Sequence, residues 1–249
     1  MIDYENYYPS LWADSEDITA LRKIAQKPFS RADYITFYSF RKFSIYLSKF
    51  IVDKSNISGN EVSYFMIAVA LIAPIVVMFL QSESTIIVAG FAFFYLIYFL
   101  DVVDGEVARI RGETSELGRF LDVALWFLID ILYLTYLYTL LGSLGYGSII
   151  LALAFWAILA EKFYLYVVSD FEVDSQINRL FVDDKSKLSH LVIGAFVKFL
   201  LSKSGIYLII LVLSILDVSF LIPLWVILNS TIILGLSLSK LVKIAAKMA

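Results

Sequence analysis

The chain of 249 residues contains no cysteine, only one histidine and only four prolines. The absence of cysteine excludes a disulfide framework, a thiolate metal site and a cysteine nucleophile. An excess of positive charge is also lacking, since the formal net charge is −3, and this indicates that nucleic acid is not a partner. The N-terminus also lacks the basic residues with which a signal peptide begins. The first twenty residues are rich in acidic side chains, whereas a signal peptide begins basic and then becomes apolar, so no cleaved leader is expected.

Apolar sequence is abundant instead. Hydrophobic residues make up 60% of the chain and the mean hydropathy is +0.82, both far from the usage of soluble domains. We expect an all-α integral membrane protein with six transmembrane helices, the fifth of them short for a span and extended by apolar residues of 188–203. The six apolar segments are 61–80, 84–108, 117–141, 146–168, 204–218 and 219–239.

The chain before the first span is expected to form a separate N-terminal part, residues 1–55, ahead of a six-helix membrane domain at 56–249. Residues 1–30 show no helical periodicity and are interpreted as a cytosolic cap or tail. Residues 31–54 place aromatic side chains among arginines and lysines, a pattern typical of an interfacial amphipathic helix lying in the headgroup region. The alternative is an ordinary surface helix packed on the protein itself.

The positions of the basic residues predict the orientation in the membrane. The loops at 81–84, at 142–147 and around Asp217 contain no lysine or arginine. All 20 basic residues are assigned to the chain before the first span, to the adjoining ends of spans two and three and of spans four and five with the regions between them, and to the C-terminal end. By the positive-inside rule, both termini are expected to be cytosolic. The central region from Asp101 to Asp122 is expected to open toward the cytosol as well.

This central region places three carboxylates at the ends of two very apolar segments. A carboxylate near the membrane core costs roughly a few kcal/mol or more, and it therefore marks an ion or substrate site. Asp101 and Asp104 lie on one face of a helix, and Asp122 in the next span faces back toward them. Oxygen ligands from two helices suit a hard divalent cation, Mg²⁺ or Mn²⁺, with open positions for water and substrate phosphates.

Small residues and an arginine accompany the carboxylates. Gly105, Ala108 and Gly118 lack the bulk that would keep a ligand or a neighbouring helix at a distance. Arg109 is suited to hold a phosphate through paired hydrogen bonds. Each feature also has an ordinary explanation, because aspartates occur at span ends, small residues serve packing and arginines satisfy topology. Their joint spacing is not explained in that way, and the combination indicates phosphoryl-group chemistry.

The spacing resembles the signature of the CDP-alcohol phosphotransferase family, also called CDP-alcohol phosphatidyltransferases, D-x2-D-G-x2-A-R-x8-G-x3-D-x3-D. Seven of its eight positions match in register: Asp101, Asp104, Gly105, Ala108, Arg109, Gly118 and Asp122. The resemblance implies six membrane helices and a transferase that moves a phospho-alcohol group from a CDP-alcohol to an acceptor hydroxyl, releasing CMP. It also implies that the three aspartates ligate metal and that the other four residues line the cytidine diphosphate site.

The eighth position is Trp126, where the family has an aspartate. The resemblance implies that this aspartate ligates a metal and accepts the proton of the acceptor, and an indole has neither charge nor acceptor atom for these tasks. Asp130 lies one turn further along, about 6 Å deeper, and is a candidate substitute. No catalytic residue is therefore assigned from the sequence.

Two interpretations of function follow from the sequence. The leading one is a transferase in phospholipid or related phosphodiester synthesis. The alternative is a catalytically impaired homologue that binds nucleotide or lipid. An ion-coupled transporter would use similar acids, but paired, Gly/Pro-interrupted spans are not evident. Expected partners are a donor of CDP-diacylglycerol type or a soluble CDP-alcohol, an alcohol or sugar-phosphate acceptor, and membrane lipids; a homodimer is compatible with these.

Overall fold

The computed structural model describes residues 7–27, 36–146, 148–170 and 203–248, and these residues form helices and no strand. The prediction of an all-α protein is therefore confirmed for this part of the chain. A π-helical turn, η2 (Thr36–Phe40), precedes α2, and a 3₁₀ turn, η3 (Ser219–Leu221), precedes the last helix. The helices are α1 (Glu16–Ala25), α2 (Arg41–Lys54), α3 (Gly59–Met78), α4 (Glu83–Arg111), α5 (Glu116–Ser143), α6 (Ser148–Asp170), α9 (Lys203–Ile215) and α10 (Ile222–Met248).

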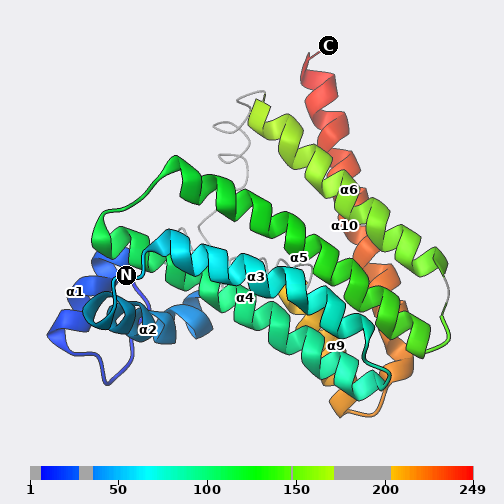
Figure 1. Ribbon diagram of the computed structural model, residues 1–249. Coiled ribbons are helices and arrows are strands. Elements are labelled where there is room, and N and C mark those ends of the chain that lie inside the picture. Colours follow the sequence, from blue (N-terminus) through cyan, green and yellow to red (C-terminus); the bar gives the residue numbers. More distant parts are fainter. Residues whose placement is uncertain (1–6, 28–35, 147, 171–202, 249) are drawn as a thin grey trace. The chain divides into compact units, whose positions relative to one another are not determined.

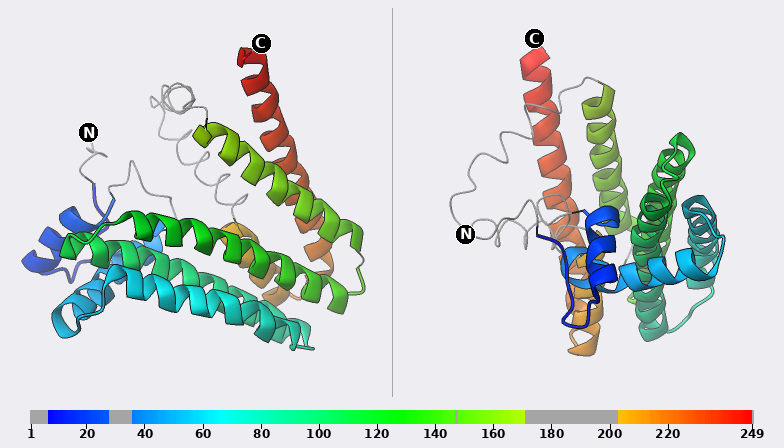
Figure 2. Two further views of the ribbon diagram at one scale, coloured as in Figure 1. Left: turned by 45° about the horizontal axis from the view of Figure 1, so that its top comes forward. Right: turned by 90° about the vertical axis from the view of Figure 1, so that its left-hand side faces the viewer.

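The chain divides into two compact units, to which α3, α4 and α5 each contribute a part. The first unit consists of Met1–Val76 and Gly90–Leu132, and the second of Val77–Ala89 and Tyr133–Ala249. All the site residues predicted from the sequence belong to the first unit. Within that unit, α1 and α2 lie near the place where α4 ends and α5 begins (Figures 1 and 2).

Four of the six expected spans are confirmed, because four helices of the described chain are long and apolar enough to cross a membrane. These are Gly59–Met78, Glu83–Arg111, Glu116–Ser143 and Ser219–Ser239. The protein is thus an integral membrane protein. Helix α6 covers the fourth expected segment, while the six-span count stays a prediction.

The fifth expected span coincides with α9, which is short. Its 13 residues extend about 20 Å at a rise of about 1.5 Å each, against a hydrocarbon core of about 30 Å. The segment that was expected to extend it, residues 188–203, lies outside the described residues apart from Lys203. Because α9 begins at the edge of the described residues, the shortness of the fifth span and its extension both stay predictions.

The second unit is built around α10. Helix α6 packs along α10, and both α9 and η3 contact it (Figure 1). Buried tyrosines form part of the core of this unit. The rings of Tyr133 and Tyr136, on α5, lie 6.0 and 4.8 Å from the ring of Tyr207 on α9. Aromatic rings at such spacing bury a large apolar area in the favoured tilted arrangements.

Helix α1 overturns the expectation that residues 1–30 lack helical periodicity. Ser15 caps the helix by accepting a hydrogen bond from the N–H of Ile18 at 3.3 Å. Ile18 and Ala25 are buried in a small apolar core with Ile45 of α2. A capping serine followed by acidic residues and by apolar residues at helical spacing was the signal available in the sequence. It was easily missed because the helix has only ten residues and half of them are polar.

A buried arginine ties α1 to the residues around it. Arg22 has a side chain that is only 2% exposed, and it donates to both carboxylate oxygens of Asp14, at 2.8 and 2.9 Å. The guanidinium also donates to the backbone carbonyls of Arg41 and Lys42, at 2.6 and 3.0 Å. The hydroxyl of Tyr46 donates to Asp14 at 2.6 Å. Burial raises the pKa of Asp14, but the hydrogen bonds from Arg22 and Tyr46 outweigh it and lower the pKa to about 2.

Helix α2 occupies the range in which an amphipathic helix was expected, although residues 31–35 lie outside the described chain. Its outward face carries large apolar side chains, since Phe43 and Phe50 are 59% and 62% exposed. Its inward face is mostly polar, so the helix is held to the protein by hydrogen bonds more than by apolar packing. The buried residues are Arg41, Ser44, Ile45 and Ser48. The location of α2 at a membrane surface stays a prediction.

Candidate functional site

The turn between α4 and α5 follows from two local signals. Gly112 has a φ of +69° and ends α4, and the N–H groups of Gly112 and of the next residue donate to the carbonyls of Arg109 and Ala108. This is the Schellman arrangement, which needs a residue with positive φ. Ser115 then begins α5 by accepting from the N–H of Gly118 at 3.1 Å. The chain reverses within a few residues, so the last turns of α4 lie beside the first turns of α5.

Helix α3 begins at the same place through a capping box. The hydroxyl of Ser58 accepts from the N–H of Glu61 at 3.3 Å, and the Glu61 carboxylate accepts from the N–H of Ser58 at 2.7 Å. Gly59, which follows Ser58, packs directly against α4. A Cβ atom at Gly59 would lie 2.8 Å from the Cβ of Ala108 and 2.8 Å from the carbonyl oxygen of Asp104. Only glycine allows the two backbones to come this close.

We expect Gly59→Ala to destabilise the protein, by about 1 to 3 kcal/mol, because the added methyl group must push α3 away from α4. Denaturant unfolding of the purified protein in detergent measures this change. Gly235→Ala on α10 is the matched control, since a Cβ there would meet no atom within 4 Å. The control should be neutral or stabilising by up to about 1 kcal/mol. Equal stability of the two variants would show that Gly59 is not a close contact.

A cavity of about 410 Å³ lies where α3, α4 and α5 meet. All seven residues that match the signature line this cavity, although 21 positions separate the first from the last. They are Asp101, Asp104, Gly105, Ala108, Arg109, Gly118 and Asp122. The structure therefore brings together the complete set of predicted site residues.

The three aspartates lie close to one another within the cavity. Asp101, Asp104 and Asp122 lie near enough for their charges to interact with one another. The hydroxyl of Ser63, on α3, donates to Asp104 at 2.6 Å. Ser63 was not predicted from the sequence, because its partner lies 41 positions away.

The chemistry of these groups fits a divalent cation. Neighbouring carboxylates repel one another, a bound cation relieves this repulsion, and oxygen ligands are what Mg²⁺ prefers. The geometry is not yet that of a metal centre, since no three acidic or histidine side chains of the described chain are grouped so that they could hold one ion. The metal-binding roles of Asp101, Asp104 and Asp122 stay predictions.

Arg109 contacts the N-terminal part of the chain. Its Nε donates to the carbonyl of Ala25, the last residue of α1. Its guanidinium lies over Gly105, where an added Cβ would be 3.1 Å from both terminal nitrogens. The charge of Arg109 also interacts with Asp104 and with Glu106. Gly105 therefore makes room for the arginine, and the expected contact of Arg109 with a phosphate stays a prediction.

Trp126 also lines the cavity, at the position where the signature has its last aspartate. The edge of its ring faces Tyr98 of α4, with centroids 6.2 Å apart and planes at 71°. Asp130, the candidate substitute, is only 6% exposed and is not among the residues that line the cavity. Substitution by Asp130 thus receives no support from the position of its side chain.

Glu106 is a site residue that the sequence analysis missed. It is fully buried, at 0% exposure, and its carboxylate accepts three hydrogen bonds of 2.7 Å each. The donors are the amide of Gln26 and the hydroxyls of Ser44 and Ser48. An acidic residue inside an apolar helix was the signal in the sequence that Glu106 has a special role. Its partners could not be identified, because they lie 58 to 80 positions away and are polar residues that form no sequence pattern.

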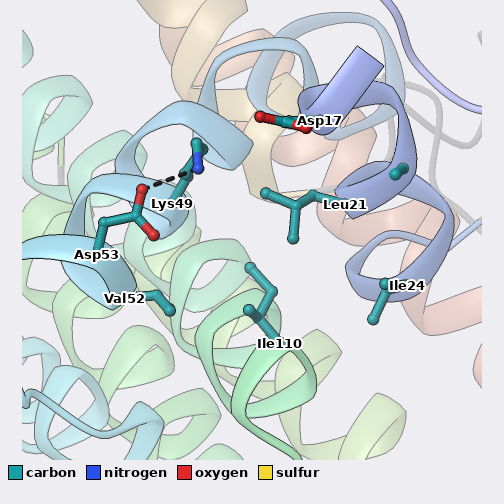
Figure 3. Close-up of a pocket in the computed structure, with 8 residues that line it drawn as sticks. Asp17, Leu21, Ile24, Lys49, Val52, Asp53 and Ile110 are labelled. Carbon is teal, nitrogen blue, oxygen red and sulfur yellow. Dashed lines mark hydrogen bonds and ion pairs between the residues drawn. The ribbon is translucent and has the colours of Figure 1, made fainter. Parts of the chain in front are cut away.

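A second hollow, of about 300 Å³, lies between α1, α2 and the end of α4 (Figure 3). Apolar side chains such as Leu21, Ile24 and Ile110 line it, and the ion pair of Lys49 and Asp53, at 2.8 Å, lies at its side. None of the residues predicted from the sequence as site residues lines this hollow. The larger cavity is therefore the candidate site.

A family model described as CDP-alcohol phosphatidyltransferase matches residues 60–227. The search of curated proteins found no match to this chain. The matched range begins at Asn60, so it contains all seven signature positions and Ser63, but it leaves out α1 and α2.

Proposed function

The chain belongs to the CDP-alcohol phosphatidyltransferase family, and we propose that it transfers a phospho-alcohol group from a CDP-alcohol to an acceptor hydroxyl, with release of CMP. The observation that carries this proposal is that the seven signature residues line a single cavity. Its volume of about 410 Å³ is in the range of small-molecule sites, which is roughly 300 to 1,000 Å³. The product is a phospholipid or a related phosphodiester.

In the proposed reaction, the oxygen of the acceptor hydroxyl attacks the phosphorus atom that carries the donor's alcohol. The bond from this phosphorus to the oxygen of CMP breaks, CMP leaves with the electron pair, and the hydroxyl proton passes to water. When bound by Asp101, Asp104 and Asp122, a divalent cation supplies positive charge that neutralises the diphosphate. The Ser63 hydroxyl orients the Asp104 carboxylate, and Arg109 is suited to pair with a phosphate.

The alternative proposal, a homologue that binds the nucleotide without efficient turnover, is supported by Trp126. This indole lines the cavity one helical turn from Asp122 and can donate a hydrogen bond but cannot accept a proton. Binding needs only the groups that surround the diphosphate. Turnover also needs a proton acceptor.

We further propose that the cavity opens toward the cytosol. Support comes from the loops at 81–84 and 142–147, which join the other ends of the spans and contain no lysine or arginine. A cytosolic opening gives the soluble product, CMP, a direct path of release.

The proposed function is tested by measuring CMP release and CDP binding with the purified protein. Either CDP-diacylglycerol or a soluble CDP-alcohol is supplied together with an alcohol or a sugar phosphate as acceptor. We expect release of CMP that depends on Mg²⁺ or Mn²⁺ for one pair of substrates. Tight CDP binding without release for any pair would favour the alternative, and the absence of both would overturn the proposal.

We expect Asp122→Asn and Asp104→Asn to lose the stabilisation by Mg²⁺ that the wild type should show. At a Mg²⁺ concentration 100 times the dissociation constant, a bound cation stabilises the folded state by about 2.7 kcal/mol. Thermal unfolding with and without Mg²⁺ measures the difference. Asp17→Asn, on the exposed side of α1, is the control and should respond like the wild type. An unchanged response in both site variants would show that the aspartates do not bind the cation.

A further inference from the structure

Part of the cavity wall comes from outside the family match. Lys27, which follows α1, and Arg41, the first residue of α2, both line the cavity. Both precede residue 60, where the matched range begins. The family match therefore describes only part of the cavity wall, and the N-terminal part of the chain contributes positive charge to the rest.

The backbone directly before Lys27 is held by hydrogen bonds. The carbonyl of Ala25 accepts from Arg109. The side-chain amide of Gln26 donates to the carboxylate of Glu106 and to the carbonyl of Arg41, both at 2.7 Å, and its oxygen accepts from Arg22 at 3.1 Å. Gln26 is 5% exposed, so these bonds are protected from water. The backbone from which the Lys27 side chain extends is therefore held in place beside α4.

Glu106 is the anchor of this arrangement. It lies on α4 two residues after Asp104, and its carboxylate accepts from Gln26 as well as from Ser44 and Ser48 of α2. This buried carboxylate therefore joins the end of α1 and the inward face of α2 to α4, close to the aspartates. Glu106 does not line the cavity, so it acts through other residues.

The charges around the cavity favour an anionic ligand that binds both a metal cation at the aspartates and the basic side chains of the wall. The ammonium of Lys27 lies close enough to Asp101 to interact with it electrostatically. Acidic and basic side chains are balanced in the wall, so a cation bound at the aspartates leaves an excess of positive charge that a diphosphate would neutralise. The acidic residues are Asp101, Asp104, Glu113 and Asp122, and the basic residues are Lys27, Arg41, Arg109 and Arg119.

We propose that Lys27 binds the diphosphate of the CDP-alcohol donor, and that Glu106, through Gln26, is the positioning residue that holds Lys27 in the cavity. This inference rests on the proposed function and adds that donor recognition extends into the N-terminal part of the chain. Lysine is suited to this contact because its ammonium is a compact charge with three donors on a flexible stem.

The test compares the affinity for CDP, measured by calorimetry in the presence of Mg²⁺, between the wild type and variants at Lys27. Loss of a charged hydrogen bond commonly lowers affinity by about tenfold or more, so Lys27→Ala should weaken CDP binding by that factor. Lys27→Arg keeps the charge and should recover most of the affinity. Lys23→Ala, an exposed lysine of α1 that does not line the cavity, is the control and should bind CDP like the wild type.

The positioning role is tested with Gln26→Ala, which removes the link without deleting the buried charge of Glu106. We expect CDP binding to weaken by roughly three- to tenfold in the wild-type background and to change little further in the Lys27→Ala background. A merely structural role would weaken binding equally in both backgrounds. Glu106→Gln, if it folds, should behave like Gln26→Ala.

The outcomes separate this inference from the proposed function. If the wild type does not bind CDP, the proposed function is wrong and this inference falls with it. If the wild type binds CDP and Lys27→Ala binds it equally well, only this inference is wrong. If Lys27 is merely the counter-ion of Asp101, its removal should strengthen Mg²⁺ binding and leave CDP affinity unchanged, which also overturns the assignment.

Discussion

Replacement of Trp126 by aspartate is expected to raise the rate of CMP release by about 10² to 10⁴, the range that a general base typically contributes. Trp126 lines the cavity, and its neighbour one turn earlier is Asp122, so a carboxylate at this position would face the same space. It would add an acceptor for the hydroxyl proton and a further oxygen ligand for a cation. Steady-state CMP release with a matched donor and acceptor measures the change.

Two further variants make this result interpretable. Trp126→Phe removes the indole without adding a carboxylate and should give no increase in rate. Asp130→Asn should leave release unchanged, because Asp130 is buried and does not line the cavity. If the wild type already releases CMP rapidly and Asp130→Asn abolishes release, the base lies one turn deeper. Rapid release that survives the loss of Asp130 would contradict both accounts and point to water or to the acceptor's own phosphate as the base.

Replacement of Asp14 by asparagine is expected to release α1 from the rest of the first unit. The Arg22 side chain is only 2% exposed, and removing the charge of its partner leaves a buried cation without its counter-ion. Breaking a buried ion pair in this way commonly costs about 3 to 5 kcal/mol. Hydrogen exchange of the α1 amides should accelerate accordingly. Asp53→Asn is the control, because its ion pair with Lys49 is accessible to solvent and its loss should leave the protection of α1 unchanged.

Acid should have the same effect as this substitution. Burial raises the pKa of Asp14, but the hydrogen bonds from Arg22 and Tyr46 dominate and lower it to about 2, against an ordinary value of 3.8. A lowered pKa in the folded state means that the stabilisation is fully present above about pH 4 and is lost as the pH falls toward 2. The protection of α1 should decrease in that interval in the wild type, and in Asp14→Asn it should be low at every pH. Equal pH dependence in both proteins would exclude Asp14 as the titrating group.

The sequence predicted the parts of this protein that depend on local pattern. Long apolar segments give the four confirmed spans, and the residues Asp101, Asp104 and Asp122 share a cavity because helical spacing and a short turn decide their positions. Gly112 and Ser115 provide that turn through ordinary helix-ending and helix-starting geometry.

The parts that were missed depend on contacts between distant residues. Glu106 is held by Gln26, 80 positions earlier, and nothing near either residue indicates the partner. Helix α1 was missed because its buried face includes Arg22, whose burial is possible only with acceptors from Asp14 and the start of α2. An apolar segment at the position of α9 was visible in the sequence, but its packing on α10 was not.

The wall that Lys27 and Arg41 add to the cavity has a consequence for how proteins of this family are compared. Residues 60–227 carry the acids, the glycines and the arginine of the signature, whereas Lys27 and Arg41 lie before this range. A shortened protein that begins at Asn60 would keep the reactive groups and lose one side of their enclosure. If Lys27 binds the donor as proposed, a comparison over the matched range alone leaves out a residue that contributes to donor binding.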